Sequence, residues 1–344
     1  MGGWGRASGL RREPSSEGGA DGGEGTAGDG GEPDRASAAE GAGRVRLGLA
    51  PVNWNNDDVP EWGVQFPYAE LVATAARLGY AGMEDGTGAP LEPGALAALL
   101  ADSGLRLPGA YRWARLSDPA RAAAELEGAL GVARRLAAAG GDVLLVAEHW
   151  TEARRAVAGR AAEASGLVLG AEGWRSLCGS LDALGRQVAA LGLRLAFHPH
   201  VGSPVETPAE VARVMEDTDP AVVGLCLDTG HTVWGGGDAV ETARRYARRI
   251  IYVHAKDVDA EALRDARARR LGLLDGLRRG VFSPLESTPR ARSSVDIVGV
   301  GAVLRAVGFG GWVIMECDRD PRAGNPADEA EMARPRLREA FAAE

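Results

Sequence analysis

The sequence predicts a (β/α)8 barrel, a closed sheet of eight parallel strands surrounded by helices. Short apolar runs of β type alternate with Ala-, Arg-, Leu- and Glu-rich stretches whose apolar residues have helical spacing. Eight such alternations follow one another in about 300 residues, which is the size and element order typical of this barrel. A doubly wound sheet is the alternative, but no G-x-G-x-x-G motif opens a helix after the first strand.

The predicted barrel begins at residue 45, because the composition of the chain changes there. Residues 1–44 contain 14 of the 49 glycines and no Val, Ile or Phe. Such a segment buries too little apolar surface to offset the entropy of ordering it. We therefore expect a disordered extension over 1–44 and one barrel domain over 45–344.

Each predicted strand is a short, mainly apolar run. In chain order the strands are RLGLAP (46–51), GMED (82–85), LPGAYR (107–112), DVLLVA (142–147), RLAFH (194–198), VVGLCLD (222–228), IIYVH (250–254) and WVIME (312–316). The helices are predicted where apolar residues recur at helical spacing, over 68–78, 93–102, 119–138, 171–191, 238–248, 260–274, 296–307 and 325–342.

Composition and charge exclude several classes of partner. The chain is 45% apolar and 25% charged, as is typical of a globular protein, and its net charge of −9 disfavours nucleic acid. No apolar run is long enough to span a membrane, and no signal peptide precedes the barrel. The three cysteines lack disulfide or metal spacing, which indicates a reducing, cytoplasmic location. We expect a small-molecule substrate, and a homo-oligomer is compatible with the sequence.

All five histidines follow predicted strands, at the end where barrel enzymes carry their catalytic groups. They are His149, His198, His200, His231 and His254. Carboxylates share this position, among them Glu84, Glu148, Asp228 and Glu316. Each residue alone is compatible with a polar strand end, but together they indicate a site.

Three of these residues end adjacent predicted strands and are our first candidates for metal ligands: Asp228, His254 and Glu316. A fourth ligand is expected from strand five, where His198 and His200 share one strand face. Mixed imidazole and carboxylate ligands suit Mn²⁺ or Co²⁺ first, with Zn²⁺ or Mg²⁺ as alternatives to them, rather than Ca²⁺. A polar barrel mouth without a metal is the other interpretation.

Further residues are candidates for substrate contacts. Lys256 is the only lysine among 39 basic residues and lies two positions after His254, so it is expected to face inward and hold a substrate oxygen. Asn53 and Trp54, after strand one, are expected to form a substrate wall. His231 is either a donor to a ligand carboxylate or a substrate contact.

Several motifs resemble the xylose-isomerase-like (sugar phosphate isomerase/epimerase) barrel superfamily, in its inosose dehydratase branch. They are APVNWNNDD, GYAGME, FHPHVGSPVET, GLCLDTGH, YVHAKD and GWVIMECDRDP. The resemblance implies metal ligands at Asp228, His254 and Glu316, and a fourth at His198, where the superfamily usually has a glutamate. The lack of that glutamate argues against epimerisation. A second departure is the 281–295 loop, where a Pro-Gly-x-Gly turn is usual.

The resemblance implies a lyase that removes water from a polyhydroxy cyclic ketone such as 2-keto-myo-inositol, in inositol catabolism. A metal ion would stabilise the enediolate. Glu316 is a candidate base, and His200 or His198 a candidate acid. Lys256 would hold the enediolate charge, while Glu84 and Glu148 are candidate substrate ligands. The alternatives are a metal-dependent ketose isomerase or epimerase, which would need Glu84 or Glu148 as its second acid/base group, and a non-catalytic sugar-binding barrel.

Overall fold

The computed structural model describes residues 43–56, 58–62, 66–160, 163, 165–285 and 291–343. The predicted extension, 1–44, lies outside the described residues except for its last two. Its disorder and the domain boundary at 45 therefore stay predictions.

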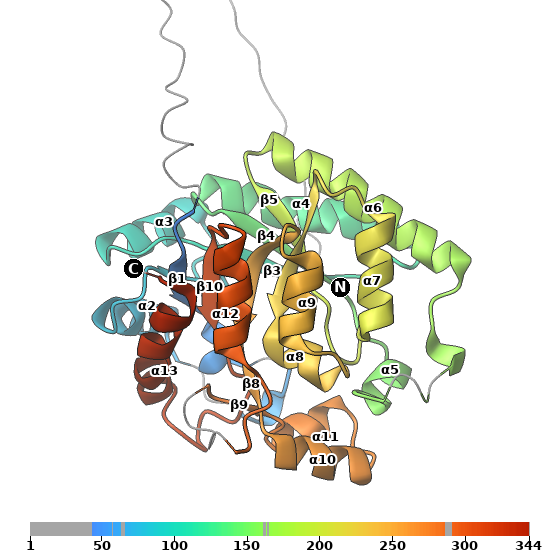
Figure 1. The fold of residues 1–344 in the computed structure, drawn as a ribbon. Helices are drawn as coiled ribbons and strands as arrows, with labels where there is room; N and C mark the ends of the chain where they lie inside the picture. Colours follow the sequence, from blue (N-terminus) through green and yellow to red (C-terminus); the bar gives the residue numbers. More distant parts are fainter. Residues whose placement is uncertain are drawn as a thin grey trace, which may run out of the picture. The chain divides into compact units, whose positions relative to one another are not determined.

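Eight parallel strands form the barrel, which confirms the predicted fold class (Figure 1). They pair in the order β2-β1-β10-β7-β6-β5-β4-β3, and a parallel bridge between Gly82 and Arg106, just before β3, joins the two ends of this sheet. Each strand overlaps its predicted run: β1 Arg46–Leu49, β2 Gly82–Met83, β3 Gly109–Ala114, β4 Val143–Glu148, β5 Arg194–Phe197, β6 Val223–Asp228, β7 Ile250–Ala255 and β10 Trp312–Met315.

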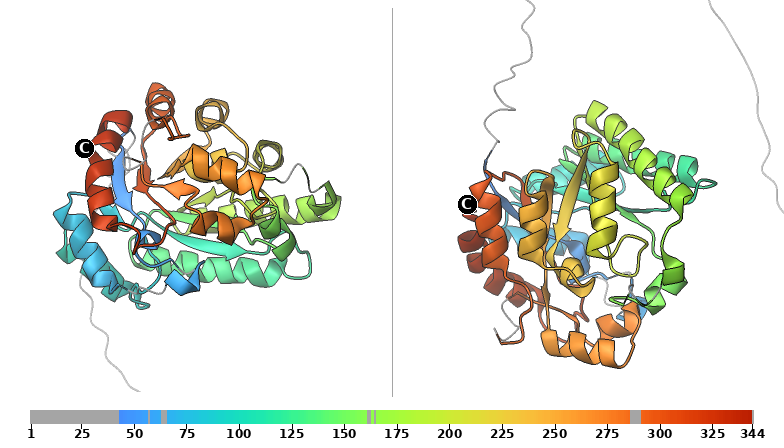
Figure 2. Two further views of the ribbon diagram at one scale, coloured as in Figure 1. Left: turned by 90° about the horizontal axis from the view of Figure 1, so that it is seen from below. Right: turned by 45° about the vertical axis from the view of Figure 1, so that its right-hand side comes forward.

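The helices lie around the outside of the sheet, as the end-on view in Figure 2 shows. Those predicted from the sequence are α2 Tyr68–Arg77, α3 Pro93–Asp102, α4 Ala122–Ala138, α6 Ala171–Ala190, α9 Ala239–Tyr246, α12 Ile297–Ala306 and α13 Pro326–Phe341. The predicted helix 260–274 is instead two helices, α10 Ala260–Ala268 and α11 Leu273–Arg278, because Arg270 adopts a left-handed φ of 55° between them. Within the described residues, three further α-helices are absent from the prediction: α5 Glu152–Ala156, α7 Pro208–Asp217 and α8 Thr229–Trp234.

Alternate residues of each strand point into the barrel and fill it. This interior cluster consists of Ala50, Val143, Leu145, Ala196, Cys226, Tyr252, Trp312 and Ile314. Gly109 permits the close packing, since a Cβ there would lie 2.7 Å from the carbonyl oxygen of Val143. Two positions further along the same strand faces, towards the C-terminal ends, the residues become polar: His198, Asp228, His254 and Glu316. The packed interior therefore forms the floor of a polar site.

A small lobe inserted after β7 covers part of the C-terminal end of the barrel. It contains an antiparallel pair, β8 Asp257–Val258 with β9 Phe282–Ser283, together with α10 and α11. Its apolar side chains form a second cluster that also includes Trp62, Val201 and Trp234, from the segments that follow β1, β5 and β6. Part of the atypical 281–295 loop, residues 286–290, lies outside the described residues. None of the described helices is both long and apolar enough to cross a bilayer.

Candidate metal centre and substrate cavity

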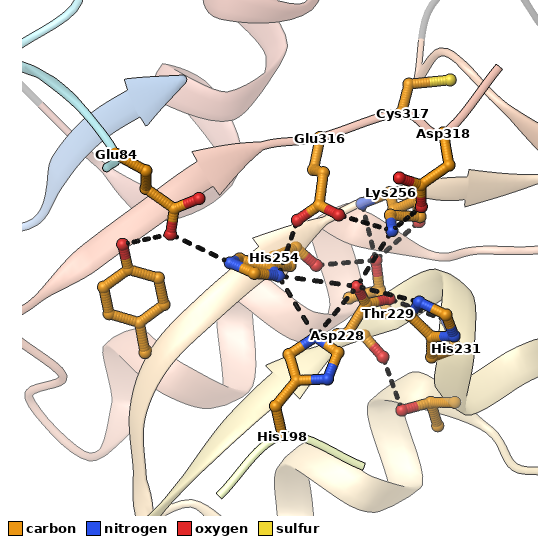
Figure 3. A network of polar contacts seen from close by, with 12 residues as sticks. Glu84, His198, Asp228, Thr229, His231, His254, Lys256, Glu316, Cys317 and Asp318 are labelled. Carbon is orange, nitrogen blue, oxygen red and sulfur yellow. Dashed lines mark hydrogen bonds and ion pairs between the residues drawn. The ribbon is translucent and has the colours of Figure 1, made fainter. Parts of the chain in front are cut away.

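The four predicted metal ligands converge at the C-terminal ends of four adjacent strands (Figure 3). His198 Nε2 lies 3.2 Å from His254 Nδ1 and 3.5 Å from Asp228 Oδ2. His254 Nδ1 lies 3.7 Å from Asp228 Oδ2 and 2.6 Å from Glu316 Oε2. Donors about 2.0–2.2 Å from one ion lie about 3 Å apart, so these four atoms have the spacing of a single coordination sphere. His198, rather than His200, is the strand-five residue brought into this cluster.

The electrostatics of the cluster fit a divalent cation. Asp228 Oδ2 and Glu316 Oε2 are buried and face the imidazole nitrogens at 2.6–3.7 Å, and Asp228 Oδ2 also lies 3.3 Å from the ammonium of Lys256. Buried carboxylates need such positive partners. Burial disfavours the charge of Asp228, but Lys256 and the neighbouring imidazoles outweigh it and hold the pKa of this carboxyl well below its usual range. The cluster therefore offers ionised carboxylates and imidazole nitrogens, a donor set suited to Mn²⁺, Co²⁺ or Zn²⁺.

Glu84 orients His254. Glu84 Oε1 accepts a hydrogen bond from the hydroxyl of Tyr252 at 2.6 Å and lies 3.2 Å from Nε2 of His254. Burial opposes the charge of His254, but Glu316 and Glu84 outweigh it and hold the pKa of this imidazole well above its usual range. If a metal ion displaced the proton of Nδ1, the atom that faces the cluster, the proton on Nε2 would still satisfy the contact with Glu84. Glu84 also lines the cavity described below, so its predicted substrate contact remains a proposal.

Lys256 lies behind the carboxylates and is 0% exposed. Its ammonium is 3.3 Å from Asp228 Oδ2 and 2.8 Å from Glu316 Oε1, and it also pairs with Asp318. Burial opposes its charge, yet the three carboxylates prevail and hold the pKa of Lys256 well above its usual range. Its donors are directed at protein carboxylates, and it does not line the cavity. The predicted contact with a substrate oxygen therefore has no support in this geometry.

His200 and His231 line the cavity beside the cluster, with ring centroids 3.7 Å apart. His200 Nδ1 is 2.7 Å from the carbonyl oxygen of Val201, which can only accept, so Nδ1 carries the proton and Nε2 is an acceptor. The N–H of Val201 donates to His231 Nδ1 at 3.2 Å, so the proton of His231 is on Nε2. Burial, above all, lowers the pKa of His200 to about 3 and that of His231 well below its usual range. The pair therefore offers one neutral acceptor and one neutral donor.

The cavity above the cluster has a volume of about 320 Å³, enough for a small polyol. Its wall combines aromatic rings with polar groups: Asn55, Asp58, Glu84, Asp85, Thr87, Tyr111, Trp113, His198, His200, His231, His254, Glu316 and Asp318. Sequence reasoning missed Asp318 and Tyr111. The period of two along a strand could have found Asp318, which is two positions after Glu316 and faces the same way.

Three predicted substrate residues do not reach this cavity. The amide of Asn53 donates to the carbonyl of Met315 and accepts from the N–H of Cys317, which ties the first loop to β10. Trp54 is buried in the main hydrophobic core. Glu148 points away from the interior, because its neighbour Ala147 occupies the inward face of β4, and it accepts hydrogen bonds from Leu116 and Ser117. These placements follow from side-chain direction, which proximity to a strand end does not determine, and substrate contacts by the three residues stay predictions.

Comparison with known proteins places the chain in a family. The model of the xylose isomerase-like TIM barrel matches residues 72–339. The chain belongs to this family. The xylose isomerase-like resemblance inferred from the motifs is thereby confirmed.

Among characterised relatives, the chain is 34% identical to an inosose dehydratase of Geobacillus kaustophilus over 294 residues, covering 84% of this chain and 92% of the relative. It is 32% identical to an inosose dehydratase of Salmonella typhimurium, over 86% of this chain and 96% of the relative. The rhizopine catabolism protein MocC of Rhizobium meliloti is 33% identical, over 85% of this chain and 87% of the relative.

Solved structures of the same fold include an L-ribulose 3-epimerase (TM-score 0.62, 16% identity, covering 87% of this chain and 95% of that one). A D-psicose 3-epimerase determined with D-fructose also has a TM-score of 0.62, at 17% identity over 86% and 99% of the two chains. At these identities the likeness supports the xylose isomerase-like fold alone.

Proposed function

We propose that this chain is a metal-dependent dehydratase, a hydro-lyase, that removes water from a polyhydroxy cyclic ketone such as 2-keto-myo-inositol through an enediolate. The observation that carries the proposal is the convergence of His198, Asp228, His254 and Glu316 at the floor of a cavity, where two buried carboxylate oxygens face two imidazoles. The relatives that share most of this chain, and that it covers almost in full, bear the name inosose dehydratase.

The four converging residues would hold the metal, with Mn²⁺ or Co²⁺ the first choice and Zn²⁺ or Mg²⁺ the alternatives. When bound, the ion supplies Lewis-acid stabilisation of negative charge on the substrate oxygens. Lys256 pairs with Glu316 Oε1 and with Oδ2 of Asp228, and Glu84 fixes the ring of His254.

The two cavity histidines are suited to the proton transfers. Elimination requires a base for the proton beside the carbonyl and an acid for the departing hydroxyl. His200 Nε2 offers a lone pair and His231 Nε2 offers a proton, as their hydrogen bonds to Val201 dictate. The C–H proton would pass to His200 Nε2, the C–O bond would break, and the hydroxide would leave as water by taking that proton back from the His200 imidazolium, while the N–H of His231 would donate a hydrogen bond to the departing oxygen. Glu316, our initial candidate base, has Oε1 paired with Lys256 and Oε2 turned to the cluster.

The biological setting that we propose is inositol catabolism in the cytoplasm, and a homo-oligomer remains compatible with the fold. The test is to incubate Mn²⁺-loaded protein with a panel of inososes and ketoses and record product masses. A cyclic ketone should lose one water. A product of unchanged mass from a ketose would instead indicate an isomerase or epimerase. Binding without any turnover would indicate a sugar-binding barrel.

A further inference from the structure

A sulfur atom lies directly beside the two imidazoles of the cluster. Cys226 is two residues before Asp228 on β6, so its side chain faces the interior one layer below the carboxylate. Ligand atoms of Cys226, His198 and His254 all lie within 4.8 Å of one another. Cys226 is 0% exposed and belongs to the apolar interior cluster.

His198 and His254 thus face two kinds of ligand atom, which lie in two successive layers of the barrel interior. Asp228 and Glu316 provide hard oxygen ligands in the upper layer, while Cys226 provides a soft sulfur in the lower layer. Oxygen donors suit Mn²⁺ and Mg²⁺, whereas a thiolate with two imidazoles suits Zn²⁺ and Cd²⁺. Glu84 lies 3.2 Å from Nε2 of His254, so this imidazole has Nδ1 alone for an ion and cannot serve both ligand sets at once.

We propose that His198, Cys226 and His254 form a second, sulfur-containing ligand set that takes thiophilic divalent cations and competes with the oxygen ligands for both imidazoles. On binding, a metal–sulfur bond forms, the S–H bond breaks and its proton passes to water. No oxidation is involved. A thiophilic ion held in this way leaves Asp228 and Glu316 without the imidazoles they share, and so inhibits the enzyme. This inference rests on the proposed metal centre, from which it takes two ligands.

In the experiment, metal-free full-length protein is titrated with Cd²⁺. The titration is monitored by the ultraviolet charge-transfer absorption that a sulfur–cadmium bond produces. Wild type, Cys226→Ala and Cys178→Ala are compared. Cys178 is also buried, but it lies on α6, outside the barrel interior, so it is the matched control. Turnover with Mn²⁺ is measured in the same preparations.

We expect the sulfur–cadmium absorption in wild type and Cys178→Ala, and its absence in Cys226→Ala. The affinity for Cd²⁺ should fall in Cys226→Ala by at least about tenfold, because even the loss of a residue that only hydrogen-bonds to a metal ligand lowers metal affinity by about that factor. The affinity for Mn²⁺ should stay within about twofold of the wild-type value. Absorption that persists in Cys226→Ala, or equal Cd²⁺ affinity in all three proteins, would overturn the inference.

Two further measurements keep the outcome decisive. If Cys226→Ala fails to fold, X-ray absorption of Cd²⁺-loaded wild type reports the ligands directly, and a shell of only nitrogen and oxygen contradicts the proposal. If Mn²⁺-dependent turnover is absent while the sulfur signal is present, the proposed function fails and the second ligand set stands.

Discussion

Lys256 contributes to the charge balance of the site, because its ammonium pairs with three buried carboxylates. Its uniqueness in the sequence marked it as important but suggested a different role, since composition does not show whether an ammonium faces substrate or protein. Asp228, His254 and Glu316 were predictable as a group, because adjacent strands of a barrel end at one rim. The directions of Asn53 and Glu148 could not be predicted, because the direction of a side chain in a turn or at a strand end depends on local geometry.

The first prediction concerns Lys256→Met, which leaves its carboxylates unpaired. We expect the free energy of unfolding without metal to fall by about 3–5 kcal/mol, the range for breaking a buried ion pair. Mn²⁺ should restore more stability to this variant than it adds to wild type, since the cation replaces the missing charge beside Asp228 and Glu316. Urea unfolding with and without Mn²⁺ measures both effects.

Arg154→Met is the control for that experiment. Arg154 is equally buried and pairs with both oxygens of Glu210, at 3.0 and 2.9 Å, outside the metal cluster. It should be destabilised to a similar extent, but gain from Mn²⁺ no more than wild type does. Equal gains in the two variants would show that Lys256 does not share its carboxylates with the ion.

The second prediction concerns pH and Glu148, whose pKa is raised from 4.5 to about 7, chiefly by burial. Between these values the folded state keeps the proton and the unfolded state releases it, so this contribution to stability is lost as the pH rises. Wild type should lose about 3 kcal/mol more than Glu148→Gln between pH 4.5 and 7.5. The glutamine can keep the hydrogen bonds to Leu116 and Ser117 without titrating. An equal loss of the free energy of unfolding in wild type and Glu148→Gln between the two pH values would contradict the raised pKa.

At the scale of secondary structure, the segment between β5 and α7 positions the cavity histidines. Thr207 and Glu210 form a capping box at the start of α7, and Glu210 also binds Arg154. Gly202 donates to Glu206, which holds the turn after His200. The T-P-A-E sequence is a capping-box signature that could have predicted α7. The division into α10 and α11 was less accessible, because it depends on a left-handed Arg270.

The third prediction is made for this segment. Thr207→Ala removes the N-cap of α7 and should lower stability by about 1 kcal/mol. It should also lower kcat, because the turn that carries His200 loosens. Asp238→Ala, at the N-cap of α9, provides a control of matched type outside the described cavity. That variant should lose similar stability and keep its kcat, and an equal kcat loss in both would exclude a positioning role for the α7 cap.

At the scale of the whole molecule, the barrel was predictable because alternating strand and helix patterns are local properties of the sequence. The lobe after β7 was not, since β8 and β9 are two-residue strands that pair across 23 intervening residues, 259–281. The site could be predicted as a set of strand ends, but the cavity wall required the loops in place.

The fourth prediction concerns the N-terminal segment, whose glycine-rich composition offers no core. A protein that starts at Arg44 should keep its Tm and turnover within experimental error. Unfolding, or loss of turnover on truncation, would show that these residues belong to the folded enzyme.

The central claim is that four converging side chains hold a metal ion that the dehydration requires. The most direct measurement is the loss of water from 2-keto-myo-inositol, followed by mass spectrometry, as metal-free protein is titrated with Mn²⁺. We expect no product before the ion is added and turnover that saturates at one Mn²⁺ per chain. Full turnover in the metal-free protein, or none at any Mn²⁺ concentration, would contradict the claim.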